Sequence, residues 1–207
     1  VINKDPPLVS IVIPCYNHAQ FVQESIQSVI DQDYENIELI IIDDGSKDSS
    51  IEVIKEMIPA CETRFKRFEF RNRENKGLCK TLNEALDWSE GEFFSVVASD
   101  DVLLKNKVKD QLTRFSIESE DCVGIFGAIE KIDSKSKRIG VVNDKKESLY
   151  CYYDILYHRH NLPACTQMIR TDVLRTVGGY PDNIIIEDWY MWLKLTEADK
   201  YLLSIPV

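Results

Sequence analysis

Two apolar runs in this chain lead into pairs of adjacent carboxylates, and they constrain the fold more than any other feature. The pairs are Asp43 with Asp44, after residues 39–42, and Asp100 with Asp101, shortly after residues 93–98. Nearly continuous apolar runs of this length are typical of strands in a parallel sheet that helices cover on both faces. Because neighbouring carboxylates repel each other, we expect a cation beside them, and a divalent metal ion is the leading candidate.

Strand and helix patterns alternate through the first half of the chain. β-rich segments at 9–13, 37–43, 65–70 and 93–98 are separated by helical spacing of apolar residues at 21–30, at 51–58 and from 78 to near 91. Pro14 is expected to stop the first strand. Such β–α units in tandem predict a doubly wound parallel sheet.

The second half of the chain has a less regular pattern. It predicts helices at 105–115 and 171–177, a strand at 122–126, a polar, turn-rich stretch at 133–146 and a final helix with Asp188 in its first turn. Gly178 and Gly179 are expected to end the helix at 171–177. The predicted fold is a single α/β domain over residues 1–207, with a mostly parallel central sheet flanked by helices and a mixed or antiparallel C-terminal half.

Size and charge exclude several classes of protein. The chain has 207 residues, 44% of them hydrophobic, which suits one sizeable core. Its net charge is -10, from 25 basic and 35 acidic residues, so nucleic acid is not expected as a partner. The longest apolar stretches are much shorter than the roughly 20 residues of a membrane span.

Cysteine usage and the chain start predict a cytoplasmic location, either free or peripheral at the inner face of the cytoplasmic membrane. The first residues lack a secretory signal, and the six cysteines show no C-x-x-C spacing, so most are expected to be buried apolar residues. His158 and His160 are expected at the surface rather than in a metal site. The ends of the chain suggest a fragment of a longer protein. The sequence leaves the oligomeric state open.

The residues that follow the predicted strands can be assigned complementary binding roles. Ligands of such sheets bind outside the carboxyl ends of the strands. Tyr16 offers a flat face to a nucleobase, Asp44 can accept hydrogen bonds from base N–H groups, and Asp100 can accept them from ribose hydroxyls. A magnesium or manganese ion on Asp101 would attract a diphosphate to this acidic cleft. Together these groups predict a site for a nucleoside diphosphate.

Six short motifs also resemble those of the family-2 glycosyltransferases of the GT-A fold, in order and spacing, over residues 8 to about 200. They are Pro14-Cys15-Tyr16-Asn17, Asp43-Asp44-Gly45-Ser46, Asn75-Lys76-Gly77, Ser99-Asp100-Asp101, Gly178-Gly179-Tyr180 and Glu187-Asp188-Trp189. Each motif alone is weak evidence, whereas six in register are hard to produce by chance. The resemblance implies a nucleotide-binding half at about 8–101 and an acceptor-side half at about 102–207.

The resemblance further implies a role for each matching residue. Asp188 would be the catalytic base, and Asp101 would hold Mn²⁺ or Mg²⁺. The reaction would be inverting transfer from a nucleotide sugar, with UDP as the expected nucleotide, to a hydroxyl of a glycan or lipid-linked acceptor during cell-surface polysaccharide synthesis. The donor nucleotide would lie against Pro14, Tyr16, Asn17, Asp44, Lys76, Gly77, Ser99 and Asp100.

One departure and several alternatives stay open at the level of sequence. Many relatives have arginine where this chain has Leu82, so a basic contact to the nucleotide would have to come from Arg73, Lys76 or Lys80. Asp188 could be a first-turn acid with Glu187 as its solvated neighbour, and His18 is expected to be an exposed polar residue. The competing functions are a nucleotide-sugar-binding module without transfer activity and a phosphoacceptor receiver domain.

Overall fold

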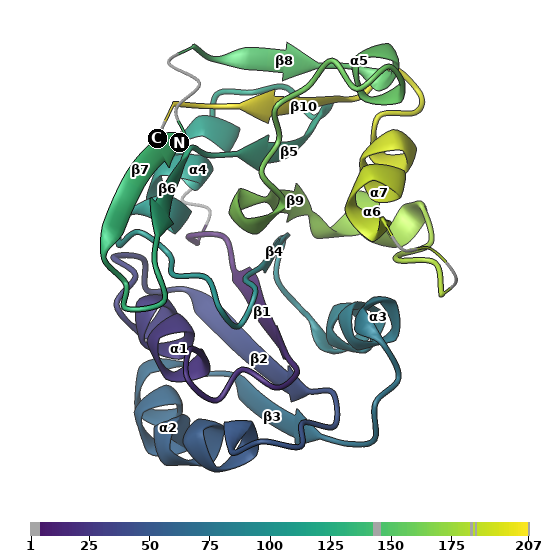
Figure 1. The fold of residues 1–207 in the computed structure, drawn as a ribbon. Coiled ribbons are helices and arrows are strands. Elements are labelled where there is room, and N and C mark those ends of the chain that lie inside the picture. Colours follow the sequence, from purple (N-terminus) through teal and green to yellow (C-terminus); the bar gives the residue numbers. More distant parts are fainter. Residues whose placement is uncertain (1–4, 143–145, 183, 185, 207) are drawn as a thin grey trace.

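The computed structural model describes residues 5–142, 146–182, 184 and 186–206, and their central feature is one mixed sheet. The sheet has eight strands in the order β3-β2-β1-β4-β9-β5-β10-β8, and helices lie on both of its faces (Figure 1). A separate two-stranded hairpin, β6-β7, lies beside it. The predicted α/β class with a mixed C-terminal half is therefore confirmed.

The bounds of the elements follow the chain from β1 to β10. The strands are β1 (Val9–Cys15), β2 (Ile37–Asp43), β3 (Phe68–Asn72), β4 (Phe93–Val96), β5 (Cys122–Phe126), β6 (Ile129–Ile132), β7 (Arg138–Val142), β8 (Ser148–Tyr150), β9 (Met168–Arg170) and β10 (Tyr201–Ser204). The helices are α1 (Val22–Ile30), α2 (Ser50–Arg64), α3 (Leu78–Trp88), α4 (Lys107–Phe115), α5 (Tyr152–Leu156), α6 (Thr171–Thr176) and α7 (Glu187–Leu195), with a short 3₁₀ turn at Ala164–Thr166.

Strand β1 lies at the centre of the parallel part of the sheet. It pairs with β2 along its whole length, up to Cys15 opposite Asp43, but with β4 only as far as Val12 opposite Val96. The expected stop at Pro14 is wrong, because β1 continues two residues beyond Ile13 to Cys15. Pro14 lies beyond the end of the β4 pairing. A proline without an N–H is tolerated where one side of the strand has no partner.

Strand β9 reverses the direction of the sheet. It pairs antiparallel with β4, through Phe94 and Ile169, and antiparallel with β5 on its other side. Strands β5 and β10 are again parallel to each other, and β8 closes this edge antiparallel to β10. The C-terminal half is thus hydrogen-bonded directly to the strands of the N-terminal half as one continuous sheet.

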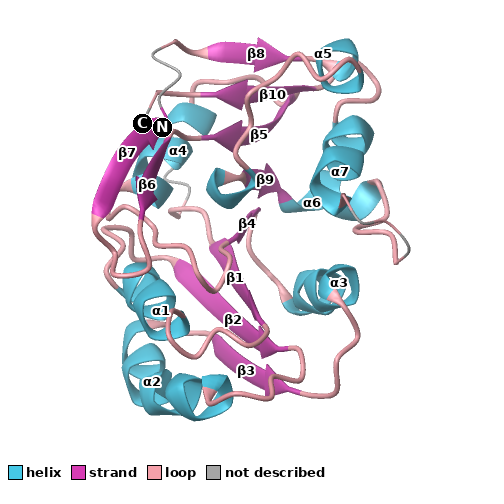
Figure 2. Ribbon diagram, in the orientation of Figure 1, coloured by secondary structure: helices cyan, strands magenta, loops and turns pink. Residues whose placement is uncertain are grey.

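Each face of the sheet has its own hydrophobic core. One face packs against α1, α2 and α4, for example through Ile26, Ile54 and Val108. The other packs against α3, α6 and α7, for example through Leu82 and Trp192. Figure 2 shows these two groups of helices on opposite sides of the strands. This double cover explains why strand residues such as Ile40 and Ile41 are both fully buried.

Several expected elements differ in extent from those observed. Strand β3 begins at Phe68 rather than at 65, because α2 continues through Pro59 to Arg64. Part of the expected turn-rich stretch at 133–146 is the β6-β7 hairpin, and residues 143–145 lie outside the described part of the chain. The short strands β8, β9 and β10 were not expected, since three or four residues carry too little pattern.

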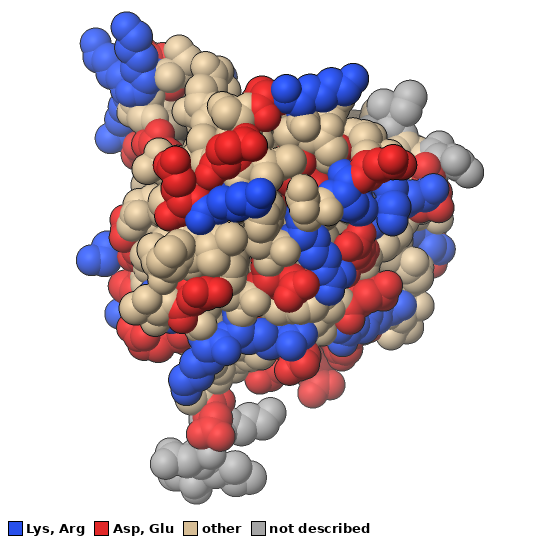
Figure 3. Space-filling model, turned by 90° about the horizontal axis from the view of Figure 1, so that it is seen from below, with Lys and Arg blue, Asp and Glu red and all other residues tan. Residues whose placement is uncertain are grey.

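Charged side chains of both signs are interspersed on the face that includes α2 and β3 (Figure 3). Arg64 with Glu35, and Arg71 with Glu69, are two of the ion pairs on this side of the molecule. No large basic patch appears on this face, as the composition led us to expect. Within the described residues, no helix is long and apolar enough to cross a membrane.

Lys107 places an ammonium group inside the protein although the residue keeps some exposed surface. Its Nζ donates hydrogen bonds to Ser95 Oγ and, over 3.2 Å, to the carbonyl of Gln167, which joins α4 to β4 and to the turn before β9. Burial lowers the pKa of Lys107 from 10.5 to about 7. At pH values between these two pKa values, Lys107 is therefore protonated in the unfolded chain and largely deprotonated in the folded chain.

Replacing Lys107 by methionine is expected to flatten the dependence of stability on pH. Between pH 7 and 10 the unfolded wild type binds more protons at this residue, so its free energy of unfolding rises with pH by up to about 1.4 kcal/mol per pH unit. Urea unfolding of both proteins from pH 6.5 to 8.5 measures the difference between the two slopes. The exposed Lys105→Met is the control, and equal slopes for wild type and Lys107→Met would contradict the expectation.

Candidate functional site

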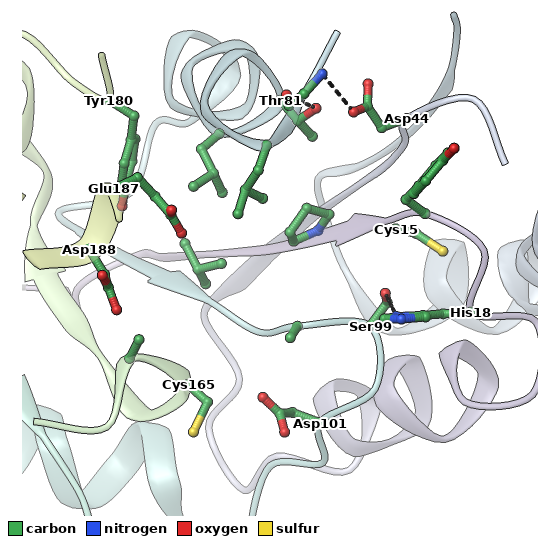
Figure 4. Close-up of a pocket in the computed structure, with 18 of the residues that line it drawn as sticks. Cys15, His18, Asp44, Thr81, Ser99, Asp101, Cys165, Tyr180, Glu187 and Asp188 are labelled. Carbon is green, nitrogen blue, oxygen red and sulfur yellow. Dashed lines mark hydrogen bonds between the residues drawn. The ribbon is translucent and has the colours of Figure 1, made fainter. Parts of the chain in front are cut away.

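A cavity of about 780 Å³ opens at the carboxyl ends of the parallel strands. Its volume lies in the range of ligand sites, about 300–1,000 Å³. Asp188 lines it from the first turn of α7, across from the strand ends (Figure 4). Six of the residues predicted to bind the donor or the metal also line it: Pro14, Tyr16, Asp44, Gly77, Ser99 and Asp101.

Three further predicted site residues do not line this cavity. Asn17 has a left-handed backbone with φ of +56°, and it connects two loops: its N–H donates to Ser46 Oγ and its Oδ1 accepts from the Lys47 N–H. Lys76 contributes its backbone N–H to Asp44, while its side chain is exposed. Asp100 is exposed at the rim of the site.

Asp44 is a buried carboxylate whose charge is compensated within the protein. Arg73 donates a hydrogen bond to Oδ1, and the N–H groups of Lys76 and Gly77 donate to the two carboxylate oxygens over 2.8 and 2.9 Å. The guanidinium of Arg73 also bonds Glu84 and Thr81. Arg73 is therefore engaged by protein groups, and its contact with Asp44 fixes the wall of the cavity.

Asp101 is a carboxylate in the opposite situation. Burial and the neighbouring charge of Asp100 both raise its pKa. Its backbone N–H bonds the carbonyl of Ala98, so the turn after β4 directs the side chain into the cavity (Figure 4). A cation at this position would lower the pKa of Asp101 and relieve its repulsion with Asp100.

His18 takes part in the site, contrary to its expected role as an exposed polar residue. Its Nδ1 lies 2.7 Å from Ser99 Oγ and 3.9 Å from Asp100 Oδ1, and its backbone N–H donates to Ser50 Oγ. The ring therefore links the loop after β1 with the acidic turn after β4. The sequence signal for this role was the position of His18 directly after the motif Pro14 to Asn17. A single histidine next to a motif is too weak a signal to predict a contact.

Glu187 and Asp188 both line the cavity from the first turn of α7. Acids are favoured in this turn because it carries the positive end of the helix dipole. The pKa of Glu187 is raised, first by burial and then by the charge of Asp188. Glu187 is half-buried, so its interpretation as a solvated neighbour is wrong, and two carboxyl groups face the cavity at this end.

Tyr180 is the largest residue on the same wall, and its backbone is held by the side chain of Asn83. The Tyr180 N–H donates to Asn83 Oδ1 over 2.8 Å, and its carbonyl accepts from Asn83 Nδ2 over 2.6 Å. This approach requires glycine before it, because a Cβ on Gly179 would lie 2.6 Å from Asn83 Oδ1. Gly179 also has a φ of +68°, which favours glycine.

The described residues contain no group of three or more His, Cys, Asp or Glu side chains arranged to hold a metal ion. Asp101 supplies one carboxylate inside the cavity, and its neighbour Asp100 lies at the rim. This donor set fits Mg²⁺ or Mn²⁺, which prefer oxygen ligands and commonly take one or two carboxylates plus substrate phosphates. The histidine pair at 158 and 160 is not part of such a group.

The sequence also matches a known protein family and known relatives. The family described as "Glycosyl transferase family 2" matches residues 10–178. A glycosyltransferase of Haemophilus influenzae is 34% identical over 187 residues, covering 90% of this chain and 71% of that protein. One from Rickettsia conorii is 34% identical over 208 residues, covering 93% of this chain and 33% of that protein.

Solved structures with the same fold are also known. A mannosyltransferase from Pyrobaculum calidifontis in complex with GDP-Man and Mn²⁺ superposes with a TM-score of 0.76 at 15% identity, over 97% of this chain and 55% of its own. Staphylococcus aureus TarS 1-349 in complex with UDP-GlcNAc gives a TM-score of 0.71 at 19% identity, over 96% of this chain and 58% of its own. The fold is that of the GT-A glycosyltransferases.

This chain belongs to glycosyl transferase family 2. The predicted resemblance is thereby confirmed, and the receiver-domain alternative is ruled out. Against three Rickettsia relatives, from R. felis, R. typhi and R. prowazekii, the chain spans 31%, 59% and 58% of their length.

Substituting alanine at Gly179 is expected to destabilise the protein more than the same change at Gly178. Both glycines have positive φ, but a Cβ at Gly178 meets nothing within 4 Å, whereas one at Gly179 meets Asn83. The forced contact should add about 1–3 kcal/mol to the loss. Thermal or urea unfolding of the two variants compares them directly. Equal losses would show that Asn83 moves away without cost.

Proposed function

We propose that this chain transfers a sugar, with inversion, from a UDP-sugar to a hydroxyl of a glycan or lipid-linked acceptor, in the synthesis of a cell-surface polysaccharide. The single observation that carries the proposal is one cavity lined by Asp44 and Asp101 at the ends of parallel strands and by Asp188 across from them. Family membership and the GT-A fold support the same reaction.

In this proposal the nucleotide occupies the end of the cavity beside β1 and β2. Tyr16, which is 44% exposed, stacks on the base, and Asp44 accepts a base N–H with a lone pair that Arg73 leaves available. Pro14, Ser99 and Gly77 line this end of the cavity. At its rim Asn17 and Lys76 hold the loops in place, and Asp100 accepts hydrogen bonds from the ribose.

The diphosphate lies over Asp101. A divalent cation held there would offset the charge that develops on the departing nucleoside diphosphate, as a Lewis acid does. The elevated pKa of Asp101, caused by burial and by Asp100, supports a cation at this position. One neighbour in the GT-A fold was solved with GDP-Man and Mn²⁺.

Asp188 accepts the proton of the acceptor hydroxyl as that oxygen attacks the anomeric carbon. Its Oδ1 accepts the N–H of Trp189 over 2.6 Å, which orients the carboxylate in the first turn of α7. The other oxygen is then available to the acceptor. Because a proton moves only as the new bond forms, Asp188 stabilises the transition state and not the bound donor.

Conservative changes of the two acids should separate binding from chemistry. Asp188→Asn is expected to lower the rate of sugar transfer or donor hydrolysis by about 10²–10⁴, with UDP affinity retained. Asp101→Asn is expected to abolish the manganese-dependent part of UDP affinity. Calorimetry with and without Mn²⁺, and assays of released UDP, measure both effects.

The exposed Asp87→Asn, on the far end of α3, is the matched control and should change neither quantity. A wild type that binds UDP with manganese but never releases it from a UDP-sugar would favour the binding-module alternative. A wild type without metal-dependent affinity for UDP would contradict the proposed function altogether.

A further inference from the structure

The hydroxyl group of Tyr180 has no hydrogen-bond partner among the described residues, although its oxygen is buried. The residue is only 3% exposed, yet it lines the cavity. Leaving a buried hydroxyl unpaired costs about 1–3 kcal/mol, so a native protein rarely keeps one without a reason. A ligand in the cavity that bonds this hydroxyl would supply the missing partner.

The backbone of Tyr180 is held firmly on this wall of the cavity. Asn83 holds both backbone polar groups of Tyr180, and the two glycines before it fix the path of the chain. The backbone position from which the Tyr180 side chain extends is therefore fixed by the protein itself. This position is set before any ligand arrives, which is the arrangement that favours selective recognition.

Two carboxyl groups lie on the same side of the cavity as this hydroxyl. Figure 4 shows Tyr180, Glu187 and Asp188 together at the left of the cavity, with Asp44 and Asp101 to their right. Burial raises the pKa of Tyr180, and the charges of Glu187 and Asp188 raise it further. The phenol therefore stays protonated and can donate, while the half-buried Glu187 carboxylate can accept.

A sugar hydroxyl matches this pair of groups because it can accept and donate at the same time. It would accept the phenolic proton of Tyr180 and donate its own to Glu187. A phosphate has only acceptors at neutral pH and would be repelled by two carboxylates, and a nucleobase belongs at the opposite end beside Tyr16. The ribose is assigned to Asp100 in the proposed function, so the remaining part of a nucleotide-sugar donor is the transferred sugar.

We propose that the Tyr180 hydroxyl, together with Glu187, binds one hydroxyl of the transferred sugar and so selects the donor. This proposal rests on the proposed function, and it makes Tyr180 a specificity-determining residue. The donor must then carry a hydroxyl at the carbon that faces Tyr180. A donor that is deoxy at this carbon would leave both protein groups unpaired, which sites of this kind reject strongly.

Tyr180→Phe tests the proposal because it removes only the hydroxyl. With Mn²⁺ present, affinity for UDP should stay unchanged, while kcat/KM for hydrolysis or transfer of the best UDP-sugar among UDP-glucose, UDP-galactose and UDP-GlcNAc should fall about 10-fold. The melting temperature should stay the same or rise, since an unpaired buried hydroxyl is removed.

Tyr34→Phe is the matched control. Its hydroxyl donates a 2.5 Å hydrogen bond to the carbonyl of Pro7, outside the cavity lining. Removing this hydroxyl should lower the melting temperature and leave both UDP affinity and kcat/KM for the UDP-sugar unchanged. The two variants thus separate a ligand-binding hydroxyl from one that serves the fold.

A panel of deoxy derivatives of the best donor completes the experiment. One derivative should lose at least about 10-fold in kcat/KM with the wild type but a smaller factor with Tyr180→Phe, where only the contact with Glu187 remains to be lost. This difference is the coupling expected of a direct contact. The proposal is overturned when Tyr180→Phe leaves UDP-sugar turnover unchanged, or when no derivative shows the coupling. A wild type without metal-dependent UDP affinity instead removes the proposed function, and this inference with it.

Discussion

The parallel pairing of β1 with both β2 and β4 is the interaction on which the rest of the structure depends. Because all three strands run in the same direction, the loops that follow them open at one edge of the sheet. Asp44 after β2 and Asp101 after β4 consequently face one cavity although 57 positions separate them in the sequence. The double cover of helices leaves this edge as the natural place for a ligand.

The two strand-end acids differ in how their charge is compensated. Asp44 is bonded by Arg73 and by two backbone N–H groups, so it belongs to the folded protein before any ligand binds. The negative charge of Asp101 is disfavoured by burial and by the neighbouring charge of Asp100, so this carboxylate would be stabilised by a cation. In the proposed function the metal ion therefore binds at Asp101, whereas Asp44 is already compensated by protein groups.

The antiparallel strand β9 gives the cavity its second wall. By pairing with β4 on one side and β5 on the other, it attaches the C-terminal half to the parallel strands of the N-terminal half. It then leads through α6 to the turn that carries Tyr180. The Asn83 side chain of α3 then fixes that turn by bonding both backbone polar groups of Tyr180. Groups from both halves of the chain thus meet at the position proposed for the sugar.

Local sequence determined the β–α alternation, the acid pairs at strand ends and the family, because strand and helix periodicity and short motifs are properties of neighbouring residues. Pattern could not assign β8, β9 and β10, since strands of three or four residues are specified by their partners in the sheet. Only the tertiary structure decided that Arg73 bonds Asp44, that His18 reaches Ser99 and that the Tyr180 hydroxyl is left unpaired. Those contacts join residues from separate elements, and their energies depend on burial and distance, which are absent from a linear sequence.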